Sequence, residues 1–165
     1  MEKIYLVTGA SSGIGKSTAL SLLENGNKVV VVARRFELLE KSYSDFNDQV
    51  IKIQWDLSNI ESLKEFSNKI FDLVGPINGL IHCAGIEKTI PLTMLDYKKV
   101  LEMFNINTFC AFELTKFFSK NKYYVKNDMS IILISSVVTK KSALGKSLYA
   151  SSKSALEGFL PSASL

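Results

Sequence analysis

The amino-acid sequence predicts an α/β fold, a doubly wound parallel sheet with helices on both faces in three α/β/α layers. Short apolar runs alternate with longer helix-like runs along the 165 residues. The segments between successive apolar runs are too long for hairpins, so we expect parallel strands joined by helical crossovers. The run Val29–Val32 is apolar and β-branched throughout, as a strand covered on both faces requires. We expect one domain over residues 1–165, a length that can bury a core.

Four strand–helix pairs and one further strand are expected before the last helix. Asn25-Gly26 ends the first helix, and Gly75-Pro76 follows the third, as residues after a helix C-terminus often do. We expect strands at Lys3–Val7, Val29–Val32, Val50–Gln54, Ile77–His82 and Ile131–Ile134. The helices are expected at Ile14–Glu24, Phe36–Phe46, Ile60–Leu73, Asp96–Ser119 and from Tyr149 onward.

The composition fits a soluble globular protein and excludes several other classes. Hydrophobic residues make up 47% and charged residues 22% of the chain, and the net charge is +4. The basic residues are scattered, which favours a phosphorylated ligand mildly and gives no nucleic-acid footprint. We find no secretory signal and no membrane-spanning run. Cys83 and Cys110 lack metal or disulfide spacing, so we expect reduced thiols, a cytoplasmic location and no metal.

The first strand ends in the turn Thr8-Gly9-Ala10-Ser11-Ser12-Gly13-Ile14-Gly15, directly before a helix. Its three glycines allow a tight turn, a close approach to a pyrophosphate and close helix–strand packing, and the helix N-terminus favours phosphate. The alternative is a plain glycine-rich turn. The octapeptide resembles the T-G-x-x-x-G-x-G turn of the short-chain dehydrogenase/reductase family, which has a Rossmann fold. The cofactor-binding residues expected here are Gly9, Ser11, Ser12, Gly13, Ile14 and Gly15.

The residues after the second strand favour NADP(H) over NAD(H). Arg34 and Arg35 stand where an acidic residue would bind the ribose of NAD, and a guanidinium can instead hold a 2′-phosphate. The alternative is a pair of solvated surface arginines.

Two further strand ends carry residues that resemble the cofactor contacts of the family. Asp56-Leu57 resembles a pair that contacts the adenine, although a simple strand-ending aspartate is an equal alternative. Ala84 and Gly85 match the family's Asn-Asn-Ala-Gly, whereas His82 and Cys83 replace its two asparagines. We therefore interpret His82, the only histidine, as structural.

Tyr149 and Lys153 are four residues apart on a predicted helix, so both side chains share one face. A tyrosine hydroxyl normally titrates near pH 10, and a neighbouring ammonium lowers the pKa of a tyrosine enough for acid–base work. Both residues are also expected to contact the cofactor. The resemblance adds Ser136, which would hydrogen-bond the substrate carbonyl, and Asn107, which would bend its helix and help hold a water near the lysine. Asn105 is a rival to Asn107, but Phe112 and Thr115 align Asn107 with the family segment.

The resemblance implies an NADPH-dependent oxidoreductase that acts on a small-molecule carbonyl or alcohol. A 3-oxoacyl thioester, a keto sugar and a small ketone all remain open as substrates. The family normally continues beyond residue 165, so we expect a fold that lacks its last strands, with the fifth strand as an apolar edge. Pro161 stands in an expected helix interior, an unfavourable site. The longer form is expected to be a homodimer or homotetramer, without nucleic-acid or membrane partners. The alternative function is a truncated, non-catalytic NADP-binding or interaction module.

Overall fold

The computed structural model of the protein describes residues 2–46, 48–141 and 143–163. Five strands and six α-helices alternate along these residues, with shorter helical turns between them. The strands are β1 (Ile4–Thr8), β2 (Lys28–Ala33), β3 (Val50–Gln54), β4 (Gly79–His82) and β5 (Ser130–Leu133). The α-helices are α1 (Gly13–Glu24), α2 (Phe36–Ser42), α3 (Leu63–Val74), α4 (Tyr97–Phe104), α5 (Cys110–Phe118) and α6 (Ser147–Ala163).

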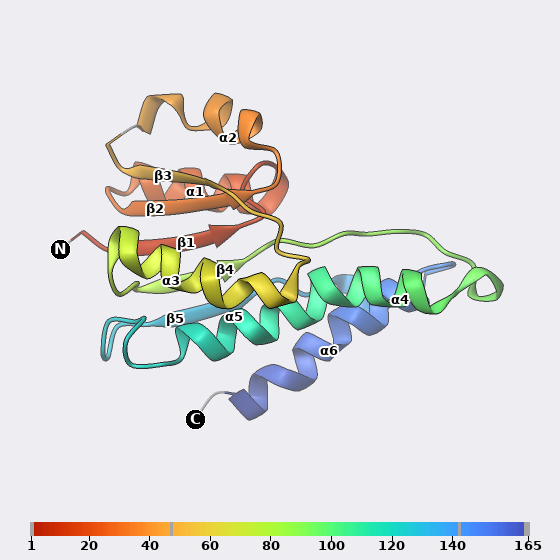
Figure 1. The fold of residues 1–165 in the computed structure, drawn as a ribbon. Coiled ribbons are helices and arrows are strands. Elements are labelled where there is room, and N and C mark those ends of the chain that lie inside the picture. Colours follow the sequence, from red (N-terminus) through yellow and green to blue (C-terminus); the bar gives the residue numbers. More distant parts are fainter. Residues whose placement is uncertain (1, 47, 142, 164–165) are drawn as a thin grey trace.

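The five strands form one parallel sheet in the order β3-β2-β1-β4-β5 (Figure 1). The order reverses between β1 and β4, because the chain passes from β3 at one edge to β4 beside β1. In an open α/β sheet, ligands bind at such a switch point, outside the carboxyl ends of the strands. The doubly wound parallel sheet predicted from the sequence is therefore confirmed, with β5 at an edge as expected.

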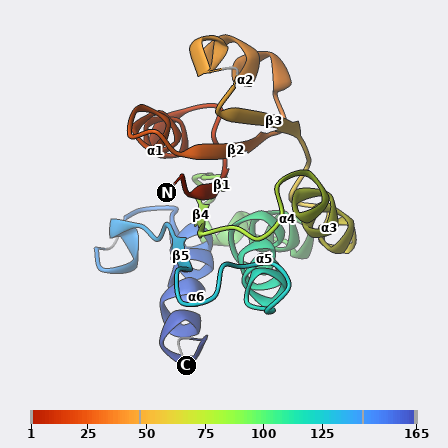
Figure 2. The ribbon, with the colours of Figure 1, turned by 90° about the vertical axis from the view of Figure 1, so that its left-hand side faces the viewer.

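Alternating side chains of β1, β2, β3 and β4 build two cores on opposite faces of the sheet. Val7, Val29 and Val31 join a core with residues of α1 and α2, among them Leu23 and Leu39. Their neighbours along the strands, Leu6, Val30 and Val32, join residues of α3 and α5 on the other face. The view along the sheet shows α1 on one side and α3 and α5 on the other (Figure 2). Burial on both faces explains why the run Val29–Val32 is apolar at every position.

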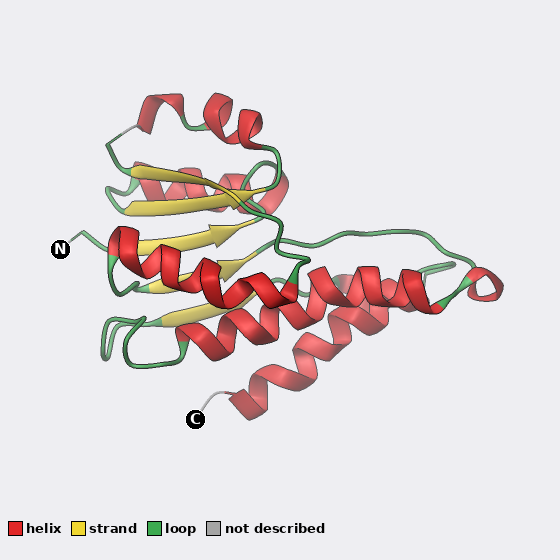
Figure 3. Cartoon of the chain, viewed as in Figure 1, coloured by secondary structure: helices red, strands yellow, loops and turns green. Residues whose placement is uncertain are grey.

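The long helix expected over Asp96–Ser119 is interrupted. A π-helical segment, Asn105–Phe109, separates α4 from α5, and the backbone N–H of Cys110 donates to the carbonyl of Asn105, five residues earlier. Asp96 caps the N-terminus of α4 by accepting from the N–H of Lys99. Together these segments form a ridge that extends beyond the carboxyl ends of the strands (Figure 3). Such π segments often occur at functional sites.

Smaller differences from the expected elements occur at helix and strand ends. The second helix stops at Ser42, and a 3₁₀ turn (Ser44–Phe46) replaces its last turn. The third helix begins with a 3₁₀ turn at Ile60–Ser62. The fourth strand begins at Gly79 rather than Ile77, and Ile77 instead forms an isolated bridge with Tyr124. These are boundary effects, since terminal turns often tighten to 3₁₀ geometry.

Helix α6 contains Pro161 two residues before the last described residue of the helix, Ala163. The helix therefore does not end at the proline, although a helix interior is an unfavourable site for this residue. Leu156 on α6 is fully buried and packs with Ala111 of α5 and Leu133 of β5. The rings of Phe112 and Phe159 stack with centroids 4.2 Å apart. This packing fixes α6 against α5, and we attribute the persistence of the helix to it.

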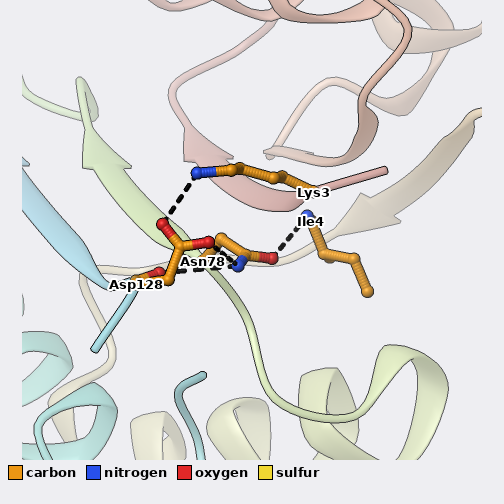
Figure 4. A network of polar contacts seen from close by, with 4 residues as sticks. All are labelled: Lys3, Ile4, Asn78 and Asp128. Atoms are coloured by element: carbon orange, nitrogen blue, oxygen red, sulfur yellow. Dashed lines mark hydrogen bonds and ion pairs between the residues drawn. The ribbon is translucent and has the colours of Figure 1, made fainter. Parts of the chain in front are cut away.

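A polar network joins three segments at the amino ends of the central strands (Figure 4). The amide oxygen of Asn78 accepts from the backbone N–H of Ile4 at 2.9 Å, and its amide nitrogen donates to the Asp128 carboxylate at 3.0 Å. Lys3 donates to the same carboxylate at 2.7 Å. The network therefore fixes the starts of β1 and β4 and the turn before β5.

None of the helices within the described residues is long and apolar enough to cross a membrane.

Candidate active site

One cavity of about 790 Å³ lies at the carboxyl ends of all five strands. Each strand contributes the residues that follow it, because the carboxyl ends of parallel strands meet at one edge of the sheet. Most of the residues predicted from the sequence line this cavity. They are Gly9, Ser11, Ser12, Gly13, Ile14, Gly15, Arg34, Arg35, Leu57, Ala84, Gly85, Ser136, Tyr149 and Lys153.

The glycine turn between β1 and α1 has no room for side chains at two of its three glycines. A Cβ atom on Gly9 would lie 2.7 Å from the backbone nitrogen of Ala84, and one on Gly15 would lie 2.5 Å from the carbonyl oxygen of Gly9. Gly13 instead has open space beside it and a positive φ of 55°. The turn therefore packs tightly against β4 on one side and leaves its backbone open on the other. This is the geometry that a pyrophosphate at a helix N-terminus needs.

Arg34 and Arg35 follow β2 and are both exposed at the cavity. The guanidinium of Arg35 lies 3.4 Å from the Ser11 hydroxyl of the glycine turn, and the backbone carbonyl of Arg34 accepts from Gln54. Two guanidinium groups thus stand beside the glycine turn. An anionic group such as a 2′-phosphate would be stabilised there.

The two residues Asp56 and Leu57, which follow β3, differ in their position relative to the cavity. Leu57 lines the cavity, whereas Asp56 is exposed and is not among the lining residues. The Asp56 carboxylate accepts from the backbone N–H and the hydroxyl of Ser58. Burial raises the pKa of Asp56, but the Ser58 hydrogen bonds and the charge of Arg34 outweigh it and hold that pKa below its ordinary value. The contacts of Asp56 are those of a turn-forming residue, the alternative that the sequence left open.

His82 lies under the glycine turn and does not line the cavity. Its ring is 1% exposed, and its Nδ1 lies 2.9 Å from the hydroxyl oxygen of Thr8, which also accepts from the backbone N–H of Ala84 at 3.2 Å. Burial, together with the charge of Lys153, lowers the pKa of His82 to about 3. His82 is thus a neutral link between the ends of β1 and β4, which agrees with its structural interpretation.

Cys83 lines the cavity beside His82 and is half-buried. Burial raises the pKa of the Cys83 thiol to about 11, although the charge of Lys153 acts in the opposite direction. The residue is therefore a neutral thiol at neutral pH.

Asn107 occupies the π-helical segment and connects three parts of the site. Its side-chain oxygen accepts from the backbone N–H of Ile86 at 2.8 Å, and its amide nitrogen donates to the Ile86 carbonyl at 2.9 Å and to the Ser152 hydroxyl at 3.0 Å. A Cβ atom on Gly85 would lie 3.0 Å from Asn107 Oδ1 and 3.4 Å from Lys153 Nζ. Gly85 thus lets Asn107 and Lys153 approach the same stretch of backbone. Asn107 is fully buried and lies behind the cavity wall.

Lys153 is buried on α6, and its ammonium donates to the carbonyl of Ile134 at 2.8 Å. Burial lowers the pKa of Lys153 below its ordinary value, with the Cys83 thiol acting in the opposite direction. Tyr149, one turn earlier on α6, lines the same cavity and packs beside Ile90, Met103 and Leu148. The two side chains therefore reach the cavity from one face of α6, as their spacing predicts.

Ser136 follows β5 and lines the same cavity as Tyr149. Its hydroxyl oxygen lies 3.4 Å from the backbone N–H of Val138, so the hydroxyl proton is free to point elsewhere. The preceding residue, Ser135, also lines the cavity, but its hydroxyl donates to Glu157.

Several cavity residues could not be singled out from the sequence. Trp55, Ile106 and Val137 are apolar residues in or beside expected strands and helices, where a core role is the ordinary interpretation. Glu87 lies in the loop after β4, where its type alone carries no signal. These residues line the cavity together with Val32, Ala33, Cys83, Ile86, Ile134 and Ser135. Within the described residues, no three His, Cys, Asp or Glu side chains are grouped so that they could hold a metal ion.

Comparison with known proteins gives the same fold and a consistent set of relatives. Residues 3–165 match the family model described as short chain dehydrogenase. The NADP-dependent 3-hydroxy acid dehydrogenase of Schizosaccharomyces pombe is 32% identical over 95% of this chain and 62% of its own. A short-chain dehydrogenase from Streptomyces avermitilis has a TM-score of 0.91 and 26% identity over 98% of this chain and 59% of its own.

A solved structure with its cofactor is also similar. A short-chain dehydrogenase of Escherichia coli CFT073, complexed with NADPH, has a TM-score of 0.83 and 28% identity, over 94% of this chain and 68% of its own. The chain spans between 54% and 62% of the length of the first curated relatives that it matches.

Proposed function

This chain belongs to the short-chain dehydrogenase family, and from that premise we propose that it is an oxidoreductase that transfers a hydride between NADP(H) and a carbonyl or alcohol substrate. The observation that carries the proposal is the single cavity that joins the glycine turn to Ser136, Tyr149 and Lys153. A nucleotide site alone needs only the first part of this cavity. The hydroxyl groups and the buried ammonium at its other end are the groups that proton transfer to a carbonyl oxygen requires.

The residues present fit a nicotinamide dinucleotide. Gly9 keeps the turn close to Ala84 after β4, Gly15 lets the start of α1 pack against the turn itself, and the open side of Gly13 leaves backbone for the pyrophosphate. Ala84 and Gly85 allow an approach to β4 beside the turn. We propose NADP(H) as the preferred form, because Arg34 and Arg35 lie at the cavity where a 2′-phosphate would be held. The similar Escherichia coli structure complexed with NADPH supports this preference.

When bound, the nicotinamide would supply or accept the hydride. We assign the proton chemistry to this chain's own residues. Tyr149 would donate its hydroxyl proton to the developing oxyanion of the substrate, and the Ser136 hydroxyl would donate a hydrogen bond to the same oxygen. The buried Lys153 ammonium would favour the tyrosinate that remains, and Asn107 would hold the backbone at Ile86 beside it. The substrate class that we propose is a small molecule with a carbonyl or secondary alcohol.

The first test is the Tyr149→Phe variant in the presence of NADPH. Without the hydroxyl, turnover of a carbonyl substrate should fall by about 10²–10⁴-fold, the usual contribution of a general acid, while NADPH binding should persist. Activity is followed by NADPH oxidation over a panel of 3-oxoacyl thioesters, keto sugars and ketones, and binding by NADPH fluorescence. Tyr97→Phe is the matched control, since Tyr97 is 76% exposed on α4.

Equal activity of Tyr149→Phe and the unaltered chain would remove Tyr149 from the mechanism. An unaltered chain that binds NADPH but turns over no member of the panel would favour the alternative, a non-catalytic nucleotide-binding module.

A further inference from the structure

The loop that carries Ser136 is held by few apolar contacts. It runs from Ser135 to Lys140 and contains a 3₁₀ turn, Val137–Thr139, none of whose residues is buried. Val137 is 75% exposed. Hydrophobic burial therefore cannot fix this loop, and its position must depend on polar contacts.

The polar contacts of the loop converge on one carboxylate, that of Glu157 on α6. The hydroxyls of Ser135 and Thr139 each lie 2.7 Å from Glu157 Oε1, and the ammonium of Lys140 lies 2.8 Å from Oε2. These donors, with Lys140 first, lower the pKa of Glu157 to about 2, so the carboxylate is charged at neutral pH. One acceptor thus receives side chains from both ends of the loop.

Thr139 extends this contact to Ser136 itself. Its hydroxyl, which has a single proton, lies 2.8 Å from the Ser136 carbonyl and 2.7 Å from Glu157, so it can donate to either. The backbone N–H of Thr139 also donates to the Ser136 carbonyl at 3.2 Å. Glu157 therefore contacts Ser135, which precedes Ser136 in the chain, and Thr139, which binds the Ser136 carbonyl. These two residues determine where the Ser136 backbone lies.

Glu157 continues a row of side chains on α6. Tyr149, Lys153 and Glu157 are spaced by four residues, so they lie one above the other on one helix face. Lys153 binds the carbonyl of Ile134, and Glu157 binds the hydroxyl of the next residue, Ser135. Successive members of the row thus bind successive residues at the end of β5.

We propose that Glu157 is a positioning residue for the reductase reaction, because it fixes the Ser136 loop against the helix that carries Tyr149 and Lys153. The inference rests on the proposed function. The exposed ion pair with Lys140 is the weaker part of the contact, since such pairs contribute little. The hydroxyl bonds of Ser135 and Thr139, which are part-buried, carry the positioning.

The anchoring is tested without any activity measurement, by amide hydrogen exchange of the chain. Glu157→Ala should raise exchange in residues 135–141 by about 10-fold or more, since a loop without its anchor opens locally. Exchange in the glycine turn, residues 9–15, should stay unchanged and serves as the internal reference. Glu102→Ala is the matched control, because Glu102 lies on α4 and its side chain forms an exposed ion pair with Lys88. Unchanged exchange in residues 135–141 would overturn the proposal.

The catalytic consequence is tested by a double-mutant cycle with Ser136. Glu157→Ala should lower kcat by about 10-fold, because a misplaced donor loses its transition-state contact, and should leave the KM for NADPH within about twofold. In a Ser136→Ala background the same change should lower kcat by less than about twofold, since coupled residues are not additive. Glu157→Gln, which keeps an acceptor oxygen for the hydroxyls, should restore most of kcat.

Three results separate this inference from the proposed function. Equal losses of kcat in both backgrounds would mean that Glu157 does not act through Ser136, and would overturn the proposal. Failure of Glu157→Gln to restore activity, when urea unfolding shows the variant folded, would do the same. Absence of turnover in the unaltered chain would refute the proposed function alone, while the exchange experiment would still decide whether Glu157 anchors the loop.

Discussion

His82 is a neutral base enclosed between the glycine turn and the π-helical segment. Within the described residues, its Nε2 is one of two buried side-chain atoms that lack a hydrogen-bond partner. Protonation of the ring in the folded protein is therefore costly, because a buried imidazolium would have neither solvent nor a carboxylate to stabilise it. This makes the single histidine a determinant of acid stability.

We predict that the free energy of unfolding falls as the pH falls below about 6.5. The pKa of His82 is about 3 in the folded protein and 6.5 when exposed, so between these values only the unfolded chain binds the proton. Stability is fully present above pH 6.5 and should decline by about 1.4 kcal/mol per pH unit until the folded pKa is reached. Urea unfolding at pH 5, 6 and 7 measures this slope.

The control for this prediction is His82→Asn, the residue that the family resemblance expects here. Because the carboxylates titrate alike in both proteins, the difference between the two slopes isolates His82. Parallel slopes would show that the ring is not the source of the pH dependence.

At the residue scale, the sequence predicted those site residues whose type or spacing is required by the local backbone, such as glycines in a tight turn or side chains four residues apart on a helix. The glycine turn and the pair Tyr149 and Lys153 fall in the cavity because spacing fixes their geometry. Asp56 does not line the cavity and instead binds Ser58. The sequence left its role open, because a strand-ending aspartate and a ligand-binding aspartate look alike in a sequence. Glu157 gave no signal, since its partners come from a loop more than fifteen residues away in the chain.

At the scale of the elements, the polar network in Figure 4 holds strands together at their amino ends, as the two apolar cores hold them to the helices. Asn78 precedes β4 and binds backbone and side-chain groups of the segments beside it, so it connects the amino ends of β1 and β4 to the turn before β5. Lys3 and Asp128 complete the network with an exposed ion pair.

We predict that Asn78→Ala lowers the free energy of unfolding by about 1–3 kcal/mol, the cost of leaving a part-buried N–H group unsatisfied. Lys3→Ala should change it little, because an exposed ion pair is screened by solvent. Chemical unfolding gives the free energies, and amide exchange at Ile4 reports the lost bond directly. A larger loss in Lys3→Ala than in Asn78→Ala would contradict this assignment.

The elements were predictable in kind and order because their apolar periodicity is strong, and the confirmed parallel sheet follows from it. The family resemblance predicted a bend at Asn107, but the apolar periodicity did not predict the π-helical segment Asn105–Phe109, because one extra residue in a helical turn leaves no composition signal. The persistence of α6 through Pro161 depends on tertiary packing, such as the Phe112–Phe159 stack, which outweighs local preference.

At the scale of the whole molecule, the cavity draws on the ends of all five strands, so a ligand that fills it contacts every part of the sheet at once. Binding to the folded state alone should therefore stabilise the entire fold.

We predict that NADPH at 100 times its Kd stabilises the chain by about 2.7 kcal/mol and raises Tm by about 5–10 °C. NADH at the same concentration should give a smaller shift, because it lacks the 2′-phosphate that Arg34 and Arg35 would hold. Differential scanning fluorimetry measures both shifts. Arg34→Gln should reduce the NADPH shift toward that of NADH, and equal shifts for the two cofactors in the unaltered chain would refute the preference.

The π-helical segment at Asn105–Phe109 also acts as a change of rotational phase. Each residue of an α-helix turns the chain by about 100°, so the one additional residue in this turn offsets the faces of α4 and α5 by that angle. Deleting one residue here would restore a regular helix. It would nevertheless rotate either the buried face of α5 out of the core or Asn107 away from Ile86. The irregular turn therefore lets one continuous helical stretch bury the inner face of α5 in the core and also keep Asn107 bonded to Ile86.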